Sequence, residues 1–380
     1  MKILLLGEYS RLHNSLKEGL IVLGHEVIIV SDGDGFKNYP SDYSIKPTWS
    51  YSKIGNFFRQ IIYRTTKFDF QKIEQGVRFY FLLNKLKGFD FVQLINERPI
   101  KTTSNFELYL LKKVFKNNNK VFLLSCGTDY LLVKSLLEKK IPKSILNPYF
   151  EDKSVKNSYQ FVFEYMQKSH FKVHDFVYQN SLGIIASDMD YFLPMNNDPK
   201  FLELIPNPIN IEILQTTKKI QNPKIVIFLG INQWNSIQKG IVFFEKALTI
   251  IKEKYGDKIE IIITKNIPYQ EYKSIYDKAN ILLDQCYAYD QGYNALEAMA
   301  RGKVVFTGAE KEFLERYNLQ EDDVAINAKP EVNYLVEKLS MLIENPEKII
   351  LIGNNAKAFI NKEHNYIKIA EKYLNVWKTK

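Results

Sequence analysis

Short apolar runs alternate along the chain with segments in which apolar residues recur at helical spacing. Residues 2–6 form an apolar run typical of a buried strand, and residues 26–30 form the next one. Between them, helical spacing is set by Leu12, Leu16, Leu20 and Leu23, and Gly24 provides a stop. Strand, helix and strand within about thirty residues predict a βαβ unit with a parallel sheet.

The alternation continues and then restarts. Further buried strands are expected at 91–95, 121–124 and 183–186, and their wholly apolar character fits a sheet covered on both faces. A turn-rich stretch at 205–210 closes this half, and 215–223 is expected to be a linker. The second half is expected to contain strands at 224–229, 259–264, 281–284 and 304–307, and helices at 241–251, 269–279, 294–301, 330–344 and 365–378. The chain is therefore predicted to be α/β, with two Rossmann-like, doubly wound domains.

Composition agrees with a soluble globular protein. The chain has 380 residues, of which 46% are hydrophobic and 25% are charged. Its two cysteines, Cys126 and Cys286, argue against a disulfide framework and a structural zinc site. The apolar runs are too short for a signal peptide or a membrane-spanning helix, so a cytoplasmic protein is expected.

Charge is unevenly distributed. The net charge is +9, and residues 51–150 hold 18 Lys and Arg against 7 Asp and Glu. Such an excess suggests an anionic partner, such as a membrane surface or a phosphate-bearing acceptor, whereas no nucleic-acid recognition motif is present. Within 51–87, basic residues alternate with aromatic ones. This mixture suits an anionic membrane surface, or else an ordinary pair of amphipathic helices with aromatic residues inward and cations solvated.

The most informative stretch for chemistry is 282–302, where a strand feeds a glycine-containing loop that opens a helix. Ligands of open α/β sheets bind beyond the carboxyl ends of the strands. Backbone N–H groups of Tyr293, Asn294 and Ala295 would form an anion site at the start of this helix. Glu297 lies one turn further on. Its carboxylate either accepts hydrogen bonds from vicinal hydroxyls, as on a ribose, or is simply a solvated residue of the first turns.

Residues 292–302 resemble the second half of the Glu-x7-Glu motif of retaining GT-B glycosyltransferases, particularly family 4. Other landmarks follow in the family's order, at 2–7, 24–27, 205–207 and 239–240. The resemblance spans nearly the whole chain. It implies a GT-B architecture, with an acceptor domain at 1–212 and a nucleotide-sugar donor domain at 213–362. It also implies that the terminal helix, 363–380, packs back on the first domain.

The resemblance carries roles to particular positions. In the family, the second motif glutamate binds the nucleotide ribose and corresponds to Glu297, and the lysine that binds the donor diphosphate corresponds to Lys239. Read locally, Lys239 would be an ordinary surface lysine. The first motif glutamate contacts the donor sugar, but Tyr289 stands there and Asp290 follows it. The arginine that usually follows the first-strand glycine is replaced by Ile231.

Neighbouring polar residues are candidates to replace that arginine. Asn232, Gln233 or Lys265 would compensate for the missing cation. Tyr269 and Tyr272 fall where the nucleotide base packs in the family, although core aromatic residues of a short helix would show the same pattern. The predicted donor-binding residues are Gly230, Asn232, Lys239, Lys265, Tyr289, Gly292, Tyr293, Asn294, Ala295 and Glu297.

On the acceptor side, residues that follow predicted strands are expected to face the cleft. These residues are Glu8, Tyr9, Ser10 and His13, and His13 would otherwise be a helix-surface histidine. Cys126 stands where the family often has histidine. Asp129 orients an acceptor hydroxyl or caps the following helix. The catalytic candidates are Lys239, Glu297 and Asp129.

No metal is predicted, because the Asp-x-Asp patterns at 32–34 and 188–190 fit turns and helix starts, and no other cofactor is expected. The resulting hypothesis is transfer of a sugar, with retention, from a nucleotide diphosphate sugar to a hydroxyl. The acceptor would be a cell-surface glycan or a lipid-linked glycan, and contact with an anionic membrane is considered. The alternatives are a non-catalytic nucleotide-sugar-binding protein and a sugar-nucleotide epimerase.

Overall fold

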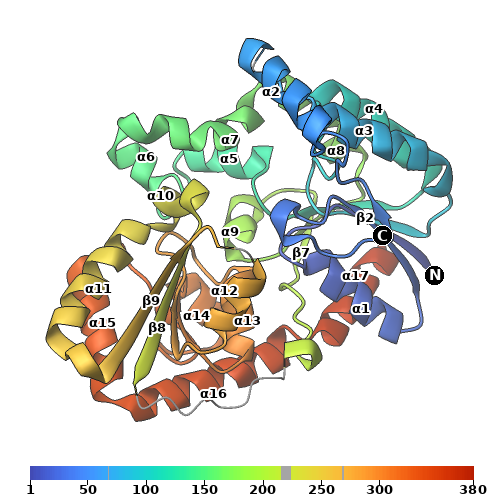
Figure 1. The fold of residues 1–380 in the computed structure, drawn as a ribbon. Helices are drawn as coiled ribbons and strands as arrows, with labels where there is room; N and C mark the ends of the chain where they lie inside the picture. Colours follow the sequence, from blue (N-terminus) through green and yellow to red (C-terminus); the bar gives the residue numbers. More distant parts are fainter. Residues whose placement is uncertain (67, 215–223, 268) are drawn as a thin grey trace.

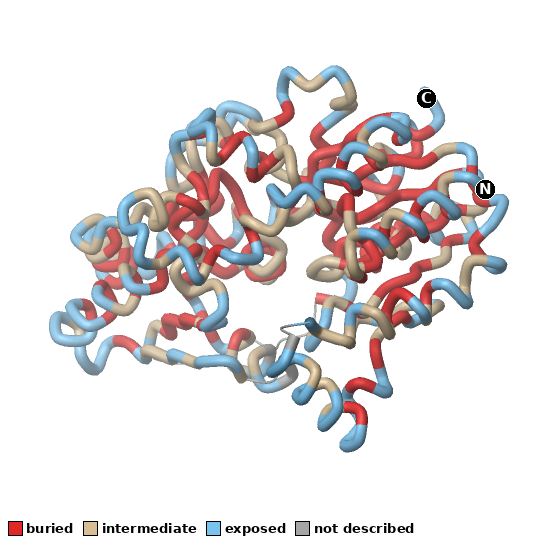
Figure 2. The backbone as a smooth tube through the Cα atoms, turned by 90° about the horizontal axis from the view of Figure 1, so that it is seen from above, coloured by how far each residue is buried: buried red, intermediate tan, exposed pale blue. Residues whose placement is uncertain are grey.

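A computed structural model describes residues 1–66, 68–214, 224–267 and 269–380. The expected linker at 215–223 therefore lies outside the described residues. The chain forms two α/β lobes, each built on a parallel sheet (Figure 1). Figure 2 shows that the buried backbone is concentrated inside each lobe.

The first lobe contains a seven-stranded sheet in the order β3-β2-β1-β4-β5-β6-β7. Its apolar strands are buried on both faces, as the sequence pattern predicted, because helices cover each side. The strands are β1 Lys2–Leu6, β2 Glu26–Ser31, β3 Tyr43–Ser44, β4 Phe91–Leu94, β5 Val121–Ser125, β6 Ile184–Ala186 and β7 Phe201–Leu204. The helices are α1 Leu12–Val22, α2 Lys53–Thr66, α3 Gln71–Leu82, α4 Ser104–Asn117, α5 Tyr130–Leu137, α6 Asn147–Glu151, α7 Gln160–Phe163, α8 Lys168–Asn180 and α9 Met189–Phe192.

The second lobe contains a five-stranded sheet in the order β12-β11-β10-β8-β9. Its strands are β8 Ile225–Ile231, β9 Ile259–Lys265, β10 Ile281–Leu283, β11 Val304–Thr307 and β12 Ile326–Asn327. Its helices are α10 Ser236–Lys239, α11 Ile241–Tyr255, α12 Tyr269–Tyr276, α13 Tyr293–Ala300, α14 Lys311–Tyr317, α15 Val332–Glu344 and α16 Pro346–Glu363. The described strand pairs of both sheets are parallel.

The chain ends in two long helices that cross the molecule. The sequence analysis missed α16, because Gly353 and two asparagines interrupt its pattern, yet Ile352, Ala356 and Ile360 form a buried face. The final helix, α17 Tyr366–Thr379, packs on α1 of the first lobe (Figure 1). Its Trp377 is fully buried there and donates a hydrogen bond to Gln93 of β4 at 3.0 Å.

No helix among the described residues is both long enough and apolar enough to cross a lipid bilayer. The two lobes contact each other directly, and buried residues of both lobes belong to one continuous apolar cluster. Their sheets point their carboxyl ends toward the junction, where the pockets described below lie.

Candidate active site

In the second lobe, the strand order reverses between β8 and β10, which lie side by side in the sheet. A reversal of this kind leaves a crevice beyond the carboxyl ends of the two strands, and such crevices are where α/β folds bind ligands. The residues that follow β8 and β10 therefore define the first place to look for a site.

Lys239 and Asn294 meet Asp284 at this crevice. Lys239 ends α10, and its Nζ atom lies 2.8 Å from Oδ1 of Asp284, the residue directly after β10. The Nδ2 atom of Asn294, in the first turn of α13, lies 3.4 Å from the same oxygen. Asp284 was not among the predicted site residues. Its signal in the sequence is a carboxylate placed directly after an apolar strand.

The N-terminus of α13 opens beside these side chains. Gly292 is the N-cap residue, and the first intrahelical hydrogen bond runs from the Leu296 amide to the Gly292 carbonyl, at 3.1 Å. The amides of Tyr293, Asn294 and Ala295 precede that bond, so they are the open donors of the helix. Together with the helix dipole and Lys239, they form a region suited to an anion.

The Tyr293 side chain ties this helix to the first lobe. Its hydroxyl lies 2.6 Å from the Ser15 hydroxyl of α1 and donates to the carbonyl of Pro208 at 2.9 Å. The helix N-terminus is therefore held against the first lobe.

Glu297 lies one turn into α13 and is largely buried, with 9% of its surface exposed. Its carboxylate lies 3.9 Å from the Arg301 guanidinium. The interpretation of Glu297 as a solvated carboxylate is therefore wrong. Its position one turn from Asn294 places it on the same helix face as the Lys239 cluster.

Gly230 is required where β8 approaches α12. A Cβ atom at this position would lie 2.4 Å from the ring of Tyr272. The Tyr272 ring packs on Phe228 with ring centres 5.2 Å apart, and its hydroxyl donates to Asn294 Oδ1 at 3.0 Å. Tyr272 is thus a packed aromatic residue that also contacts the site. The side chain of Tyr269 lies outside the described residues.

Two predicted residues do not join the Lys239 cluster. Asn232 accepts a hydrogen bond from the Trp234 amide at 3.1 Å and so caps a short turn. Lys265 pairs with Glu245 at 3.2 Å, and 55% of its side chain is exposed. Both Lys265 and Ile231 line a separate pocket of about 420 Å³, between α6 and the start of α11.

Tyr289 and Gly292 line a pocket of about 190 Å³ between the lobes. The Tyr289 hydroxyl accepts a hydrogen bond from the Lys143 amide at 3.4 Å, and 3% of the residue is exposed. The Lys143 Nζ atom pairs with Glu310 across the junction at 2.5 Å. The sequence analysis missed Lys143, which lies in an ordinary loop pattern between α5 and α6.

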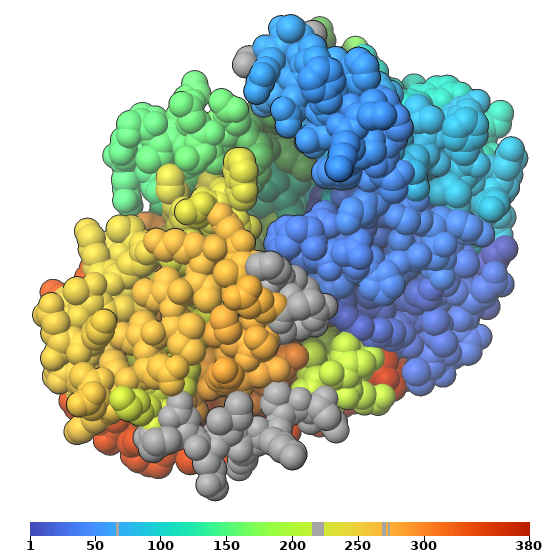
Figure 3. Space-filling model, viewed as in Figure 1, coloured from blue at the N-terminus to red at the C-terminus, as the bar shows by residue number. Residues whose placement is uncertain are grey.

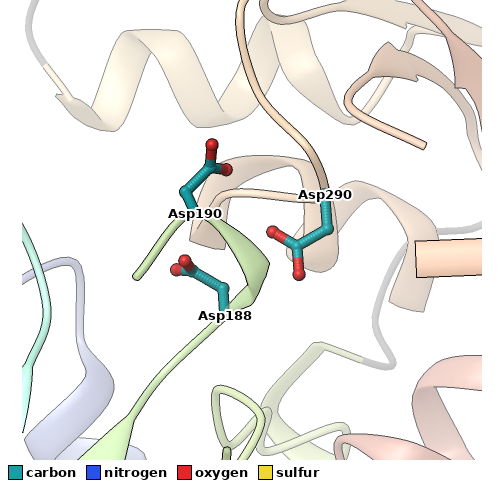
Figure 4. Close-up of side chains that lie close together, drawn as sticks. All are labelled: Asp188, Asp190 and Asp290. Atoms are coloured by element: carbon teal, nitrogen blue, oxygen red, sulfur yellow. The ribbon is translucent and has the colours of Figure 1, made fainter. Parts of the chain in front are cut away.

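Three carboxylates converge beside this pocket (Figure 4). Asp188 and Asp190 come from the start of α9 and Asp290 from the loop before α13, and their oxygens lie within 4.8 Å of one another. Asp290 accepts from the Met189 amide at 2.9 Å, and Asp190 from the Tyr289 amide at 3.2 Å.

The local interpretation of 188–190 as a helix start is confirmed, because Asp188 caps α9. The convergence with Asp290 was not foreseen. Carboxylates at such distances are also the ligands that Mg²⁺ and Ca²⁺ use, and the absence of a metal from the reaction remains a prediction.

Burial and mutual repulsion shape the ionisation of this cluster. Burial raises the pKa of Asp190 to about 6. Burial, followed by the charge of the neighbouring aspartates, raises the pKa of both Asp188 and Asp290 well above the usual range. A shared proton among carboxylates this close would lower their repulsion, so we expect the stability of the junction between the lobes to depend on pH.

In the first lobe, the prediction that Glu8 faces the cleft is wrong. Glu8 is fully buried and accepts hydrogen bonds from the amides of His13 and Asn14 and from the Asn14 side chain, at 3.3, 2.9 and 2.6 Å. Its carboxylate holds the start of α1, and burial raises its pKa to about 7.

His13 is also fully buried, so both the prediction that it faces the cleft and the alternative of a helix-surface histidine are wrong. Its Nδ1 atom lies 2.8 Å from the Gly7 carbonyl, and burial lowers its pKa to about 3. The imidazole is therefore neutral. Tyr9 and Ser10 are partly exposed: Lys101 lies over the Tyr9 ring at 4.7 Å, and the Ser10 hydroxyl accepts from Lys37 at 2.9 Å.

Asp129 caps α5 by accepting from the Leu132 amide at 2.8 Å, so the capping interpretation is confirmed. Its other oxygen accepts from the Ser125 hydroxyl at 2.5 Å, and 5% of the residue is exposed. Both oxygens are thus used within the loop. Cys126, beside this loop, is a free thiol of intermediate exposure.

Comparison with known proteins decides the architecture. Sucrose-phosphate synthase from Thermosynechococcus elongatus matches with a TM-score of 0.61 at 14% identity, over 100% of this chain and 98% of that one. Anabaena Alr3699/HepE, in complex with UDP and glucose, matches with a TM-score of 0.61 at 11% identity, over 100% of both chains. This chain has the GT-B fold.

Other matches to this GT-B chain point in the same direction. Residues 236–375 match the model of a family described as glycosyl transferase-like. The UDP-GlcNAc 2-epimerase of Neisseria meningitidis, bound to UDP-GlcNAc, matches with a TM-score of 0.53 at 14% identity over 100% of both chains. No curated protein sequence is significantly similar. At these identities the structural matches establish the fold.

Proposed function

We propose that this protein is a glycosyltransferase that moves a sugar from a nucleotide diphosphate sugar to an acceptor hydroxyl with retention. The observation that carries the proposal is the joint placement of Lys239 and the open amides of α13 at the crevice of the second sheet. The family match over 236–375 covers these residues, and Alr3699/HepE is a GT-B neighbour seen with UDP and glucose.

The site supplies what departure of a diphosphate needs. Lys239 and the α13 amides stabilise the negative charge that develops on the leaving oxygen as the bond from the sugar to the diphosphate breaks. Asp284 holds the Lys239 ammonium beside the helix start. Glu297 would hold the ribose hydroxyls, as a buried acceptor one turn away. A phosphate oxygen of the donor takes the proton of the acceptor hydroxyl as the new bond forms on the same face of the sugar.

The acceptor would be a growing cell-surface glycan or a lipid-linked glycan that enters from the first lobe. The excess of basic residues in 51–150 supports an acceptor that carries phosphate.

The first experiment is a thermal-shift and calorimetric screen of the wild type against UDP, GDP, ADP, CMP and their sugars. A nucleoside diphosphate should bind the wild type and bind Glu297→Ala at least tenfold more weakly, about the contribution of a buried charged hydrogen bond. Glu253→Ala, an exposed carboxylate of α11 in the same lobe, is the matched control and should bind like the wild type. A folded wild type that binds no nucleotide would contradict the donor-site proposal.

The epimerase match motivates one further comparison. Incubation with the bound nucleotide sugar, without an acceptor, should leave the sugar unchanged when the product is analysed by NMR. Conversion to an epimer would replace the transferase proposal. Sugar that is bound, but neither converted nor transferred to any acceptor, would identify a binding protein.

A further inference from the structure

Helix α2 presents an apolar face to solvent. Ile54, Phe57, Phe58 and Ile61 are 69%, 63%, 49% and 44% exposed. Their spacing places them on one side of the helix, since residues three and four apart are neighbours on a helix surface. The expectation that the aromatic residues of this segment point inward is therefore wrong for α2.

The opposite side of α2 contacts the chain segments that flank the helix, at Trp49 and Asp69. Gly55 is buried, and a Cβ atom there would lie 1.9 Å from the Trp49 carbonyl oxygen, so only glycine permits this contact. Arg59 makes two hydrogen bonds to Asp69, both at 2.8 Å. A small residue and an ion pair thus attach the helix, whereas ordinary surface helices attach through their apolar side.

Cations border the exposed apolar face. Lys53 and Arg64 are exposed, and helical geometry places both along one edge of the face. α2 contains no Asp or Glu, and residues 51–87 hold eight Lys and Arg against two acids. Both acids are engaged: Asp69 pairs with Arg59, and Glu74 accepts hydrogen bonds from the amides of residues 48–50.

The position of α2 leaves this face accessible. The helix lies along the outside of the first lobe, at the end of the molecule opposite α16 (Figure 1). In the space-filling view its residues form a bulge beside a recess between the lobes (Figure 3). A convex helix with an apolar face and a cationic edge needs no shaped partner to cover it when it lies in a membrane interface.

We propose that α2 docks this protein on an anionic lipid bilayer, with the apolar face inserted among the acyl chains and Lys53 and Arg64 contacting lipid phosphates. Charge favours lipid over a second copy of the chain, because two such helices would bring like charges together. The α2 segment follows β3, whose carboxyl end lies on the same side of the sheet as the junction between the lobes. If the proposed function holds, a lipid-linked acceptor would reach the first lobe directly from the docked surface; the docking itself does not depend on that function.

The test is flotation of the full chain with vesicles of phosphatidylcholine, alone or with 30% phosphatidylglycerol. The wild type should float with the anionic vesicles. Phe57→Ser with Phe58→Ser should bind them about thirtyfold more weakly, through loss of two inserted aromatic rings. Because these side chains are exposed, the variant should keep the wild-type unfolding temperature.

Two paired variants separate the contributions. Lys53→Gln with Arg64→Gln should weaken binding to anionic vesicles by about fivefold for each cation, and should leave binding to neutral vesicles unchanged. The matched controls lie on α16: Ile350→Ser with Leu351→Ser for apolar exposure, and Lys348→Gln with Lys357→Gln for charge. Both controls should float like the wild type.

Three outcomes would overturn the proposal. The first is a folded wild type that floats with neither vesicle. The second is an equal loss of binding in the α16 controls. The third is self-association of the wild type in sedimentation velocity that the Phe57→Ser and Phe58→Ser changes abolish, without vesicle binding, which would make a second copy the occupant. Nucleotide binding, measured in the same preparations without vesicles, reports separately on the proposed function.

Discussion

The two lobes use the carboxyl ends of their sheets differently. In the first lobe, two carboxylates that follow strands serve the fold itself: Glu8 holds the start of α1, and Asp129 caps α5. In the second lobe, Lys239 keeps 27% of its side chain exposed beside the open amides of α13. The oxygens of Glu8 and Asp129 are therefore engaged within the first lobe, whereas Lys239 keeps hydrogen-bonding capacity for a ligand.

A position after a strand therefore does not by itself make a residue available to a ligand. A carboxylate within reach of nearby amides is captured by them, because an unpaired buried amide costs more than a solvated one. A long side chain such as lysine can satisfy a local partner with one N–H group and still offer the others.

The substitution with the largest predicted effect on stability is at Glu8, in the first lobe. Glu8→Ala removes three hydrogen bonds at a fully buried position and leaves two amides unpaired, so we expect a loss of about 3 kcal/mol in the free energy of unfolding. Urea denaturation followed by circular dichroism measures it. The nucleotide affinity of the folded fraction should stay within twofold of the wild type. A stable Glu8→Ala protein with weakened ligand binding would instead show that Glu8 contacts the ligand, as the sequence predicted.

In the second lobe, Lys239→Met should weaken binding of a nucleoside diphosphate by about thirtyfold, roughly 2 kcal/mol, because a charge-assisted contact is lost. The substitution also leaves the buried Asp284 carboxylate without its cationic partner. The double variant Lys239→Met with Asp284→Asn should therefore recover unfolding stability without recovering affinity. Calorimetry and thermal unfolding of both proteins check this. Recovered affinity in the double variant would show that Asp284, and not the missing cation, limits binding.

The junction between the lobes gives a pH-dependent prediction. Burial raises the pKa of Asp190 to about 6, above its unfolded value, so its contribution favours folding at low pH and is lost as pH rises through 6. Asp190→Asn keeps the acceptor for the Tyr289 amide but cannot ionise. It should be more stable than the wild type by about 1–2 kcal/mol at pH 8, with a smaller gap at pH 5.

Denaturant titrations at the two pH values measure this gap, and Asp175→Asn, an exposed carboxylate of α8, is the control that should show none. A stability difference between Asp190→Asn and the wild type that grows toward pH 5 would contradict a raised pKa of Asp190.

The smallest predicted effect on stability and binding is at Lys265, which belongs to the second lobe but pairs on the surface with Glu245. Lys265→Met should change stability by less than about 0.5 kcal/mol. Nucleotide affinity should stay within twofold of the wild type, measured beside Lys239→Met in the same calorimetric series. A loss as large as that of Lys239→Met would extend the donor site into the pocket near α6.

The alternation of apolar runs predicted most strands and the parallel α/β class, because buried parallel strands need continuous apolar sequence. It missed α16, whose buried face is diluted by glycine and asparagine. Periodicity also detected the amphipathic pattern of α2 without revealing which side faces the protein. That orientation depends on the contacts of Gly55 with Trp49 and of Arg59 with Asp69, which the apolar pattern does not reveal.

Within the site, the local sequence pattern located α13 and Lys239, because the signals for helix starts and strand ends come from neighbouring residues. The convergence of Asp188 and Asp290 could not be read in this way, because about a hundred residues separate them and only the closing of the lobes brings them together. Burial of Glu8 and His13 was equally hidden, because the pattern gives the strand end and not the direction of the side chain.

The return of α17 to the first lobe has a mechanical consequence. The chain crosses between the lobes after β7 and again between α16 and α17, and the two crossings are joined. His364 Nδ1 lies 2.9 Å from the Asn207 carbonyl, and Ile209 and Asn365 form a parallel bridge. Two chain segments that are hydrogen-bonded side by side are expected to resist twisting and sliding but to allow bending. We therefore expect any relative motion of the lobes to be a rotation about this paired connection, which would bring the two sheet edges back into the same alignment.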